Sequence, residues 1–376
     1  MVKCALIAAI LPAMAGAQFL IDPAAVPEQL KKIGSNQGEQ PLKCSVTPFR
    51  PTLNFGFRFQ AGYTVDVPMG QYTGEGHYWL FGTRITSEGH DPVWLAGRVS
   101  LPNVPPTTNE SETGGVYLLG EGRYHVAWKM VDDSGRSCRK EWDIDARLKH
   151  SERNVKLGLA PGTVTDLTLR GTGRGPNLKD DAAPIRLTIL LHAAPMSPRR
   201  TALGPRDRGL LLGAIAVLLE RVPVRSVRMV VFNLDQHREI YRQEPFTSRS
   251  FRQVVQVLDG LQLGLVNYRV LESRKGHLDL LANLVNRELE AREPSDVVVF
   301  IGGMARYTDV PPPEELAAAS GNSPRFFYLQ CRPFSGMVPA MLADSISRVV
   351  GKMKGKTILI YKPEDLAKAI EQVEKP

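Results

Sequence analysis

The 376-residue sequence lacks the short motifs that identify the common catalytic classes. It contains no Gly-x-Ser-x-Gly nucleophile motif, no P-loop, no His-Glu-x-x-His helix and no cysteine pair with zinc spacing. Each motif places a nucleophile, a phosphate cradle or metal ligands at a fixed spacing, so its absence removes the direct sequence argument for that chemistry. The sequence therefore favours a binding or structural protein over an enzyme.

Long apolar runs are also absent after the N-terminus, because no later segment reaches about 18 apolar residues. The N-terminus itself combines Lys3, the apolar run 4–14 and the small residues Ala15-Gly16-Ala17. This pattern is typical of a secretory signal peptide over residues 1–17, with cleavage before Gln18. We expect a secreted or periplasmic protein without stable membrane insertion.

Cysteine is scarce, with four residues in the whole chain. Cleavage removes Cys4, and an oxidising compartment allows disulfides among the rest to persist. Cys44 and Cys138 belong to the first and last strands expected in the N-terminal region, so we predict that they form a disulfide. Cys331 ends an apolar run and is interpreted as a buried free thiol.

The formal net charge is +8, but basic and acidic residues are mostly interleaved. No aromatic platform or recognition-helix pattern accompanies the basic residues, which argues against a nucleic-acid partner. The balance permits an acidic protein partner.

Residues 18–40 are predicted to be a linker, and residues 41–150 show the short alternating runs of an antiparallel β-sandwich. The clearest pattern is a hairpin: Tyr124, Val126, Trp128 and Met130 form an apolar face, and turn residues 132–135 lead into a returning strand. Residues 119–124 resemble the tyrosine corner of immunoglobulin-like domains, in which a Tyr hydroxyl bonds to upstream backbone. This resemblance implies an Ig-like domain.

Residues 151–183 are predicted to be a connecting strand and linker, because residues 170–176 are rich in Gly, Arg and Pro. From residue 184 to residue 376, apolar strands alternate with helices, as in a doubly wound α/β domain with a mostly parallel sheet. The expected strands are 186–191, 228–233, 239–242, 296–301, 326–331 and 357–361, and the expected helices are 205–221, 248–259, 277–292, 313–319, 338–352 and 363–373.

One pair of strands has no room for a helix between them, since only residues 234–238 separate 228–233 from 239–242. This spacing predicts a hairpin and an antiparallel edge strand. The order of elements over 184–376 resembles the von Willebrand factor A (vWA) arrangement, as found in bacterial exported proteins with an Ig-like module in front.

Members of the vWA family that bind a metal ion carry Asp-x-Ser-x-Ser after the first strand and usually an Asp after the fourth. Here the first set reads His192, Ala194 and Met196, and the second position reads Gly302-Gly303. A hard cation needs carboxylate and hydroxyl oxygens. We therefore expect no metal site and no cofactor.

Two functions remain open. In the first, an exported adhesion or scaffold protein binds a protein partner at the strand ends through His192, Arg306 and Arg332, with the arginines pairing directly to acidic groups. The same edge is expected to gather Arg199, Arg200, Met304 and Cys331. In the second, a hydrolase or ligand-binding enzyme uses residues around His192 and Ser335.

Overall fold

The structure is a computed structural model that describes residues 18–31, 33, 40–167, 176–178, 184–197, 200–263, 273, 275–318, 323–333 and 343–375. The chain divides into two compact units. The first takes its described residues from 1–53, 58–148 and 157–171, and the second from 54–57, 149–156 and 172–376. The predicted signal peptide over 1–17 lies outside the described residues.

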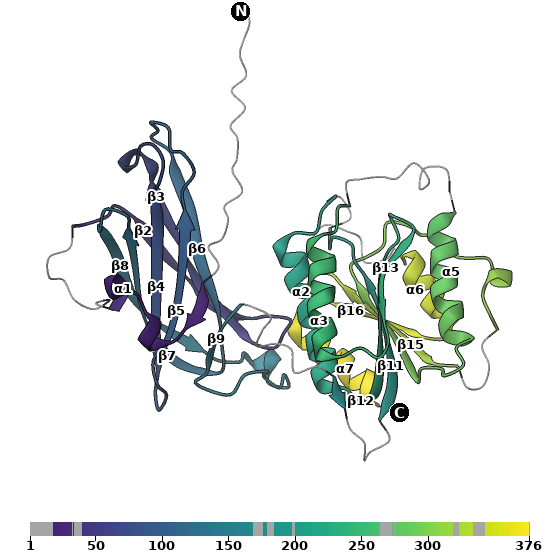
Figure 1. The fold of residues 1–376 in the computed structure, drawn as a ribbon. Helices are drawn as coiled ribbons and strands as arrows, with labels where there is room; N and C mark the ends of the chain where they lie inside the picture. The colour runs from purple at the N-terminus through teal and green to yellow at the C-terminus, as the bar shows by residue number, and fades with distance from the viewer. Residues whose placement is uncertain are drawn as a thin grey trace, which may run out of the picture. The chain divides into compact units, whose positions relative to one another are not determined.

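Two antiparallel sheets form the first unit (Figure 1). The five-stranded sheet has the order β1-β5-β4-β7-β8, and the four-stranded sheet has the order β2-β3-β6-β9. Their bounds are β1 Phe19–Ile21, β2 Ser45–Leu53, β3 Phe59–Pro68, β4 Tyr78–Ser87, β5 Val93–Ser100, β6 Glu110–Leu119, β7 Gly122–Asp132, β8 Ser137–Ala146 and β9 Val164–Asp166.

The hairpin predicted around residues 122–144 is confirmed as β7 and β8, which pair from Gly122↔Ala146 to Val131↔Ser137. Its apolar face is buried in a core that also contains Phe59, Tyr63 and Tyr117 from the other sheet. Side chains from both sheets therefore pack together as a β-sandwich. The predicted disulfide Cys44–Cys138 is present, and it links the residue before β2 to β8 on the opposite sheet.

Two boundary predictions for this unit need correction. The expected linker 18–40 contributes β1, which pairs with β5, and the short helix α1 (Glu28–Lys31), whose Leu30 packs beside Val131. Apolar residues in this segment cover part of the outer sheet face, so it is not a solvated linker. Residues 164–166 form β9, which pairs with β6, so the sandwich continues beyond residue 150.

A seven-stranded, mostly parallel sheet forms the centre of the second unit. Its order is β10-β12-β11-β14-β15-β16, and β13 pairs antiparallel with β12 as the hairpin argument predicts. The bounds are β10 Asn177–Leu178, β11 Ile185–His192, β12 Pro223–Asn233, β13 Arg238–Gln243, β14 Val297–Gly302, β15 Arg325–Cys331 and β16 Lys356–Ile360.

Helices cover both faces of this sheet, which explains why β14 is buried along its whole length. In Figure 1, α2 (Pro205–Arg221), α3 (Ser248–Asp259) and α7 (Pro363–Glu374) lie on one side, while α5 (Gly276–Leu289) and α6 (Ser345–Lys352) lie on the other. Leu281, Leu284 and Val349 pack with Val298 and Phe300 on the α5–α6 side.

Helices α2 and α3 have the predicted bounds, but others differ. Helix α5 ends at Leu289 rather than Arg292, because a turn leads from it into β14. The expected helix 313–319 appears as a 3-10 turn over Pro313–Glu315. Helix α6 begins at Ser345, and the first part of the predicted helix 338–352 lies outside the described residues. Residues 177–178, predicted as linker, form β10.

Candidate functional site

The ends of four parallel strands define the candidate site. His192 of β11 stands opposite Phe232 of β12 and Gly302 of β14, and Gly302 stands opposite Gln330 of β15. The loops that follow these strands must therefore emerge at the same edge of the sheet, where ligands of open α/β sheets usually bind. We call the loop residues 193–197, 200, 234–237, 303–307 and 332–333 the carboxyl edge.

The loop after β11 is buried and firmly held. The amide of Ala193 donates to the Phe232 carbonyl at 2.8 Å, and the Asn233 side-chain amide donates to the Ala193 carbonyl at 2.7 Å. Ala194 and Met196 are 4% and 7% exposed. This loop therefore gives the carboxyl edge an apolar floor.

Close packing explains the Gly302-Gly303 pair. A Cβ on Gly302 would lie 2.8 Å from Cβ of His192, and one on Gly303 would lie 3.1 Å from Cα of Met196. Larger side chains at these two positions would push the end of β11 and the loop after it away from β14. Gly302 thus allows the ends of β11 and β14 to pair closely, and Gly303 allows the loop after β11 to approach the loop after β14.

His192, predicted as a partner-binding residue, is 2% exposed and stacks on Phe232 at 5.3 Å between ring centroids. Burial lowers the pKa of His192 below its usual value, so the ring is neutral at pH 7. Within the described part of the chain, neither ring nitrogen has a hydrogen-bond partner. His192 therefore lies beneath the surface of the edge, where a partner cannot touch it directly.

The two predicted arginines reach the surface and are positioned by neighbouring loops. Nη2 of Arg306 donates to the Arg200 carbonyl at 2.7 Å, and its Nε lies 3.4 Å from a carboxylate oxygen of Asp235. Nε of Arg332 donates to the Gln330 side chain at 2.8 Å, and its Nη2 lies 3.4 Å from the sulfur of Met304. Both cations are thus held on loops around the 303–306 turn.

Asp344 organises the edge from below, and sequence reasoning missed it. This residue is 1% exposed and caps α6 by accepting from the Ser347 amide at 2.8 Å. It also accepts from the Ala305 amide at 2.7 Å and from the side chains of Tyr328 and Gln330 at 3.2 and 3.0 Å. An Asp before a Ser-rich helix start is an N-cap signal, but the predicted helix began too early to use it.

Two more histidines at the edge were also missed. His237 lies in the turn between β12 and β13, and His277 lies in the first turn of α5. Their ring centroids are 5.8 Å apart, and the His277 ring stacks on Tyr307 at 3.8 Å with an interplanar angle of 13°. They are more than thirty residues apart in sequence, so no local pattern pairs them.

The remaining predicted edge residues divide into two groups. Cys331 is buried, and burial raises the pKa of its thiol to about 12, which keeps it protonated and unreactive. Arg199 and Ser335 lie outside the described residues. Among the described residues, no group of three or more His, Cys, Asp and Glu side chains is placed to hold a metal ion.

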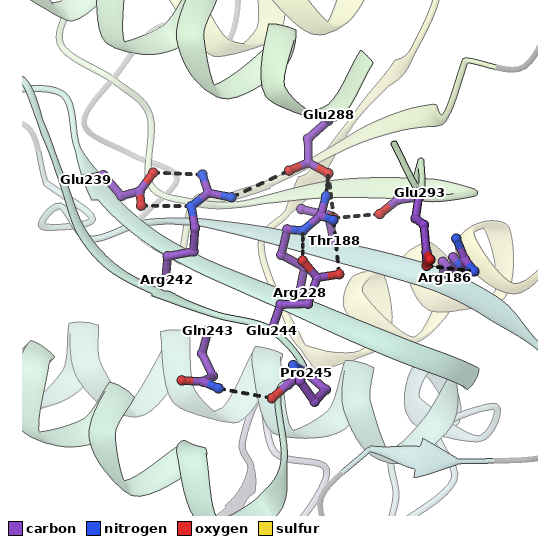
Figure 2. A network of polar contacts seen from close by, with 11 residues as sticks. Arg186, Thr188, Arg228, Glu239, Arg242, Gln243, Glu244, Pro245, Glu288 and Glu293 are labelled. Atoms are coloured by element: carbon purple, nitrogen blue, oxygen red, sulfur yellow. Dashed lines mark hydrogen bonds and ion pairs between the residues drawn. The ribbon is translucent and has the colours of Figure 1, made fainter. Parts of the chain in front are cut away.

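A buried charge cluster lies in the middle of the same sheet, away from the strand ends (Figure 2). Glu288 of α5 is fully buried; it accepts from Thr188 at 2.7 Å and from Arg228 at 2.6 Å. Arg242 of β13 lies 3.9 Å from the other Glu288 oxygen. This cluster fixes α5 against three strands and is structural, because its central carboxylate has no access to solvent.

The sandwich contains a separate open hollow of about 670 Å³. Arg123, His125 and Asp143 are on its wall, and Nδ1 of His125 lies 2.8 Å from a carboxylate oxygen of Asp143. His125 and Asp143 thus pair across β7 and β8, and both side chains are already engaged with each other on the wall of the hollow.

None of the helices in the described ranges is long and apolar enough to cross a membrane. No protein-family model matches the chain, and no curated protein matches it.

Several solved structures show weak similarity. A superoxide reductase (neelaredoxin) mutant from Archaeoglobus fulgidus is 12% identical, with 30% of this chain and 96% of that chain covered and a TM-score of 0.21. A hypothetical protein from Pyrococcus horikoshii is 15% identical, with coverage of 31% and 99% and a TM-score of 0.21. A lipoprotein from Bacteroides thetaiotaomicron is 8% identical, with coverage of 33% and 95% and a TM-score of 0.15. Similarity at this level supports no inference about function.

Proposed function

We propose that this chain is an exported, non-enzymatic adhesion or scaffold protein that binds an acidic protein partner through the carboxyl edge of a vWA-like domain. The single observation that carries the proposal is the placement of Arg306 and Arg332 on loops around one turn, above an apolar floor. Guanidinium groups pair with carboxylates directly and often bidentately, so such a site needs no bridging cation.

The architecture supports the proposed domain types. A sheet whose neighbours run β13-β12-β11-β14-β15-β16, with β13 antiparallel, has the order implied by the vWA resemblance. In the sandwich, the Tyr124 hydroxyl donates to the Gly120 carbonyl at 3.0 Å, the bond that the Ig-like tyrosine corner requires. The Cys44–Cys138 disulfide is consistent with an oxidising compartment, and hence with export.

The alternative function, a hydrolase or ligand-binding enzyme around His192 and Ser335, gains less support. His192 is buried with neither ring nitrogen bonded to a described residue, whereas a general base must reach the proton that it removes. The enzyme proposal would need a reacting group beside His192.

A direct binding measurement tests the proposal. A rhodamine-labelled peptide of alternating Asp and Glu is titrated with the protein, and its fluorescence anisotropy gives Kd; a peptide of alternating Asn and Gln is the uncharged control. We expect R306E/R332E to weaken binding of the acidic peptide by about tenfold or more, because both pairing cations become anions. The matched variant R249E/R252E makes the same charge change on exposed residues of α3 and should bind like the wild type. Equal losses in both double variants, or equal binding of the two peptides, would contradict the proposal.

A further inference from the structure

Asp235 occupies a shared position at the carboxyl edge. Its carboxylate lies 3.4 Å from Nε of Arg306, and its negative charge also acts on the imidazoles of His192, His237 and His277. The Asp235 carboxylate therefore forms an ion pair with Arg306 and also acts electrostatically on three histidines. If a neighbouring imidazole gains a proton, it competes with Arg306 for Asp235.

The imidazoles of His237 and His277 have unused hydrogen-bonding atoms. His277 is 4% exposed, and neither of its ring nitrogens has a hydrogen-bond partner among the described residues. The same is true of Nδ1 of His237, which approaches Gly276 so closely that a Cβ there would lie 2.5 Å from it. A protonated ring at either place would gain N–H donors that only a nearby carboxylate could satisfy strongly.

We propose that His237, His277 and Asp235 form an acid-activated switch: when the imidazoles are protonated, Asp235 turns toward them and releases Arg306 to bind the acidic partner. This inference rests on the proposed function, because it concerns the affinity of the same edge. Acidification acts twice in the same direction, since the added positive charge also attracts an acidic partner.

The charged surroundings support the switch. Burial lowers the pKa of both His237 and His277, so both are neutral at pH 7 and take up protons only on acidification. Carboxylates oppose this effect: Asp235 in the β12–β13 turn and Asp279 on α5 act on both rings. Asp309, on the loop after β14 that also carries Arg306 and Tyr307, acts on His277. The two imidazoles repel each other when charged, because the charge of His237 lowers the pKa of His277. The charges of Asp235 and Asp344 raise the pKa of His192 and the charge of Arg306 lowers it, but burial has the largest effect.

The test uses the rhodamine-labelled Asp-Glu peptide with the full chain, between about pH 7.5 and about pH 5.5, where the peptide carboxylates stay ionised. We expect the wild type to bind about tenfold more tightly at the lower pH, which is within the usual range for coupled sites. At about pH 6, titration calorimetry in buffers of different ionisation enthalpy should show proton uptake on binding, because affinity and protonation are reciprocally linked.

Two kinds of variant separate the parts of the switch. H237Q/H277Q should remove most of the pH dependence, so that its affinity at about pH 5.5 is close to its own affinity at about pH 7.5. D235N should already bind more tightly at about pH 7.5, because Arg306 loses its counter-ion without any proton. H125Q changes a histidine of the sandwich and is the matched control for loss of an imidazole. Circular dichroism at each pH confirms that the variants remain folded.

The outcomes distinguish the switch from the proposed function. Binding that is salt-sensitive and needs Arg306, yet has the same pH dependence in the wild type and in H237Q/H277Q, would overturn the switch alone. Weaker binding of the wild type at the lower pH, with native circular dichroism, would also overturn it. Failure of the acidic peptide to bind at either pH would overturn the proposed function and the switch together.

Discussion

The Arg306 guanidinium and the Asp235 carboxylate, 3.4 Å apart, connect the loop after β14 to the turn after β12. The two strands are not neighbours in the sheet, because β11 lies between them. The ion pair therefore joins two loops that follow strands on either side of β11. Its members are partly exposed, so we expect it to be easily rearranged by solvent, salt or a partner.

The disulfide should stabilise the sandwich strongly. Cys44 and Cys138 are 94 residues apart, and C44S/C138S should lower the free energy of unfolding by about 4 to 5 kcal/mol in the chain-entropy model. All four Trp residues belong to the first unit, so tryptophan fluorescence in denaturant follows this unit alone. A midpoint unaffected both by the substitutions and by reductant would show that the bridge contributes no stability.

The tyrosine corner should make a smaller contribution. The Tyr124 hydroxyl donates to the Gly120 and Thr163 carbonyls at 3.0 and 3.2 Å, so Y124F should cost about 1 to 2 kcal/mol of unfolding free energy. The control is Y78F, which keeps an aromatic ring stacked beneath Arg98. The same fluorescence measurement applies, and a cost for Y78F equal to that of Y124F would refute the role of the corner.

The buried carboxylate of Glu288 should stabilise the second unit through its ion pairs with Arg228 and Arg242. E288Q leaves the Arg228 cation without its partner on α5, and we expect a loss of about 3 kcal/mol. E290Q, at an exposed position just beyond α5, should be nearly neutral. Helical circular dichroism follows this unfolding, because the long helices all belong to the second unit. R228M/E288L should cost less than E288Q, since it removes both charges.

Acidification should destabilise the second unit. Burial lowers the folded-state pKa of His192, His237 and His277, so below about pH 6.5 the unfolded chain binds more protons than the folded chain. Their contribution is complete above that pH and is lost as the pH falls toward the folded-state values, by at most about 1.4 kcal/mol per pH unit for each histidine. Hydrogen exchange of β11 and β14 measures this loss.

A matched pair of variants tests the assignment to buried histidines. H277Q should reduce the pH dependence of exchange, whereas H150Q, at an exposed position of the same unit, should leave it unchanged. Equal pH dependence in the wild type and in H277Q would show that the titrating group lies elsewhere.

Local patterns predicted much of the fold. The bounds of α2 and α3, the β7–β8 hairpin and the antiparallel β13 follow from apolar periodicity and from the number of residues between elements. The disulfide could be predicted because few cysteines remain to pair. The connecting strand predicted within 151–183 is present as β9, but prediction failed for β1 and β10, which have three and two residues. Such short strands carry too few residues for a period and exist only because a neighbouring strand offers hydrogen bonds.

The sequence by itself determined the strand-end positions and their residue types, including His192, Ala194 and Met196. Only the tertiary structure decided what these residues do. Burial removed His192 from the surface, and long-range packing joined Asp235 to Arg306, His237 to His277, and Asp344 to Gln330. Each of these pairs joins residues from separate segments of the chain, and their pKa values and contacts depend on distances that no local pattern specifies.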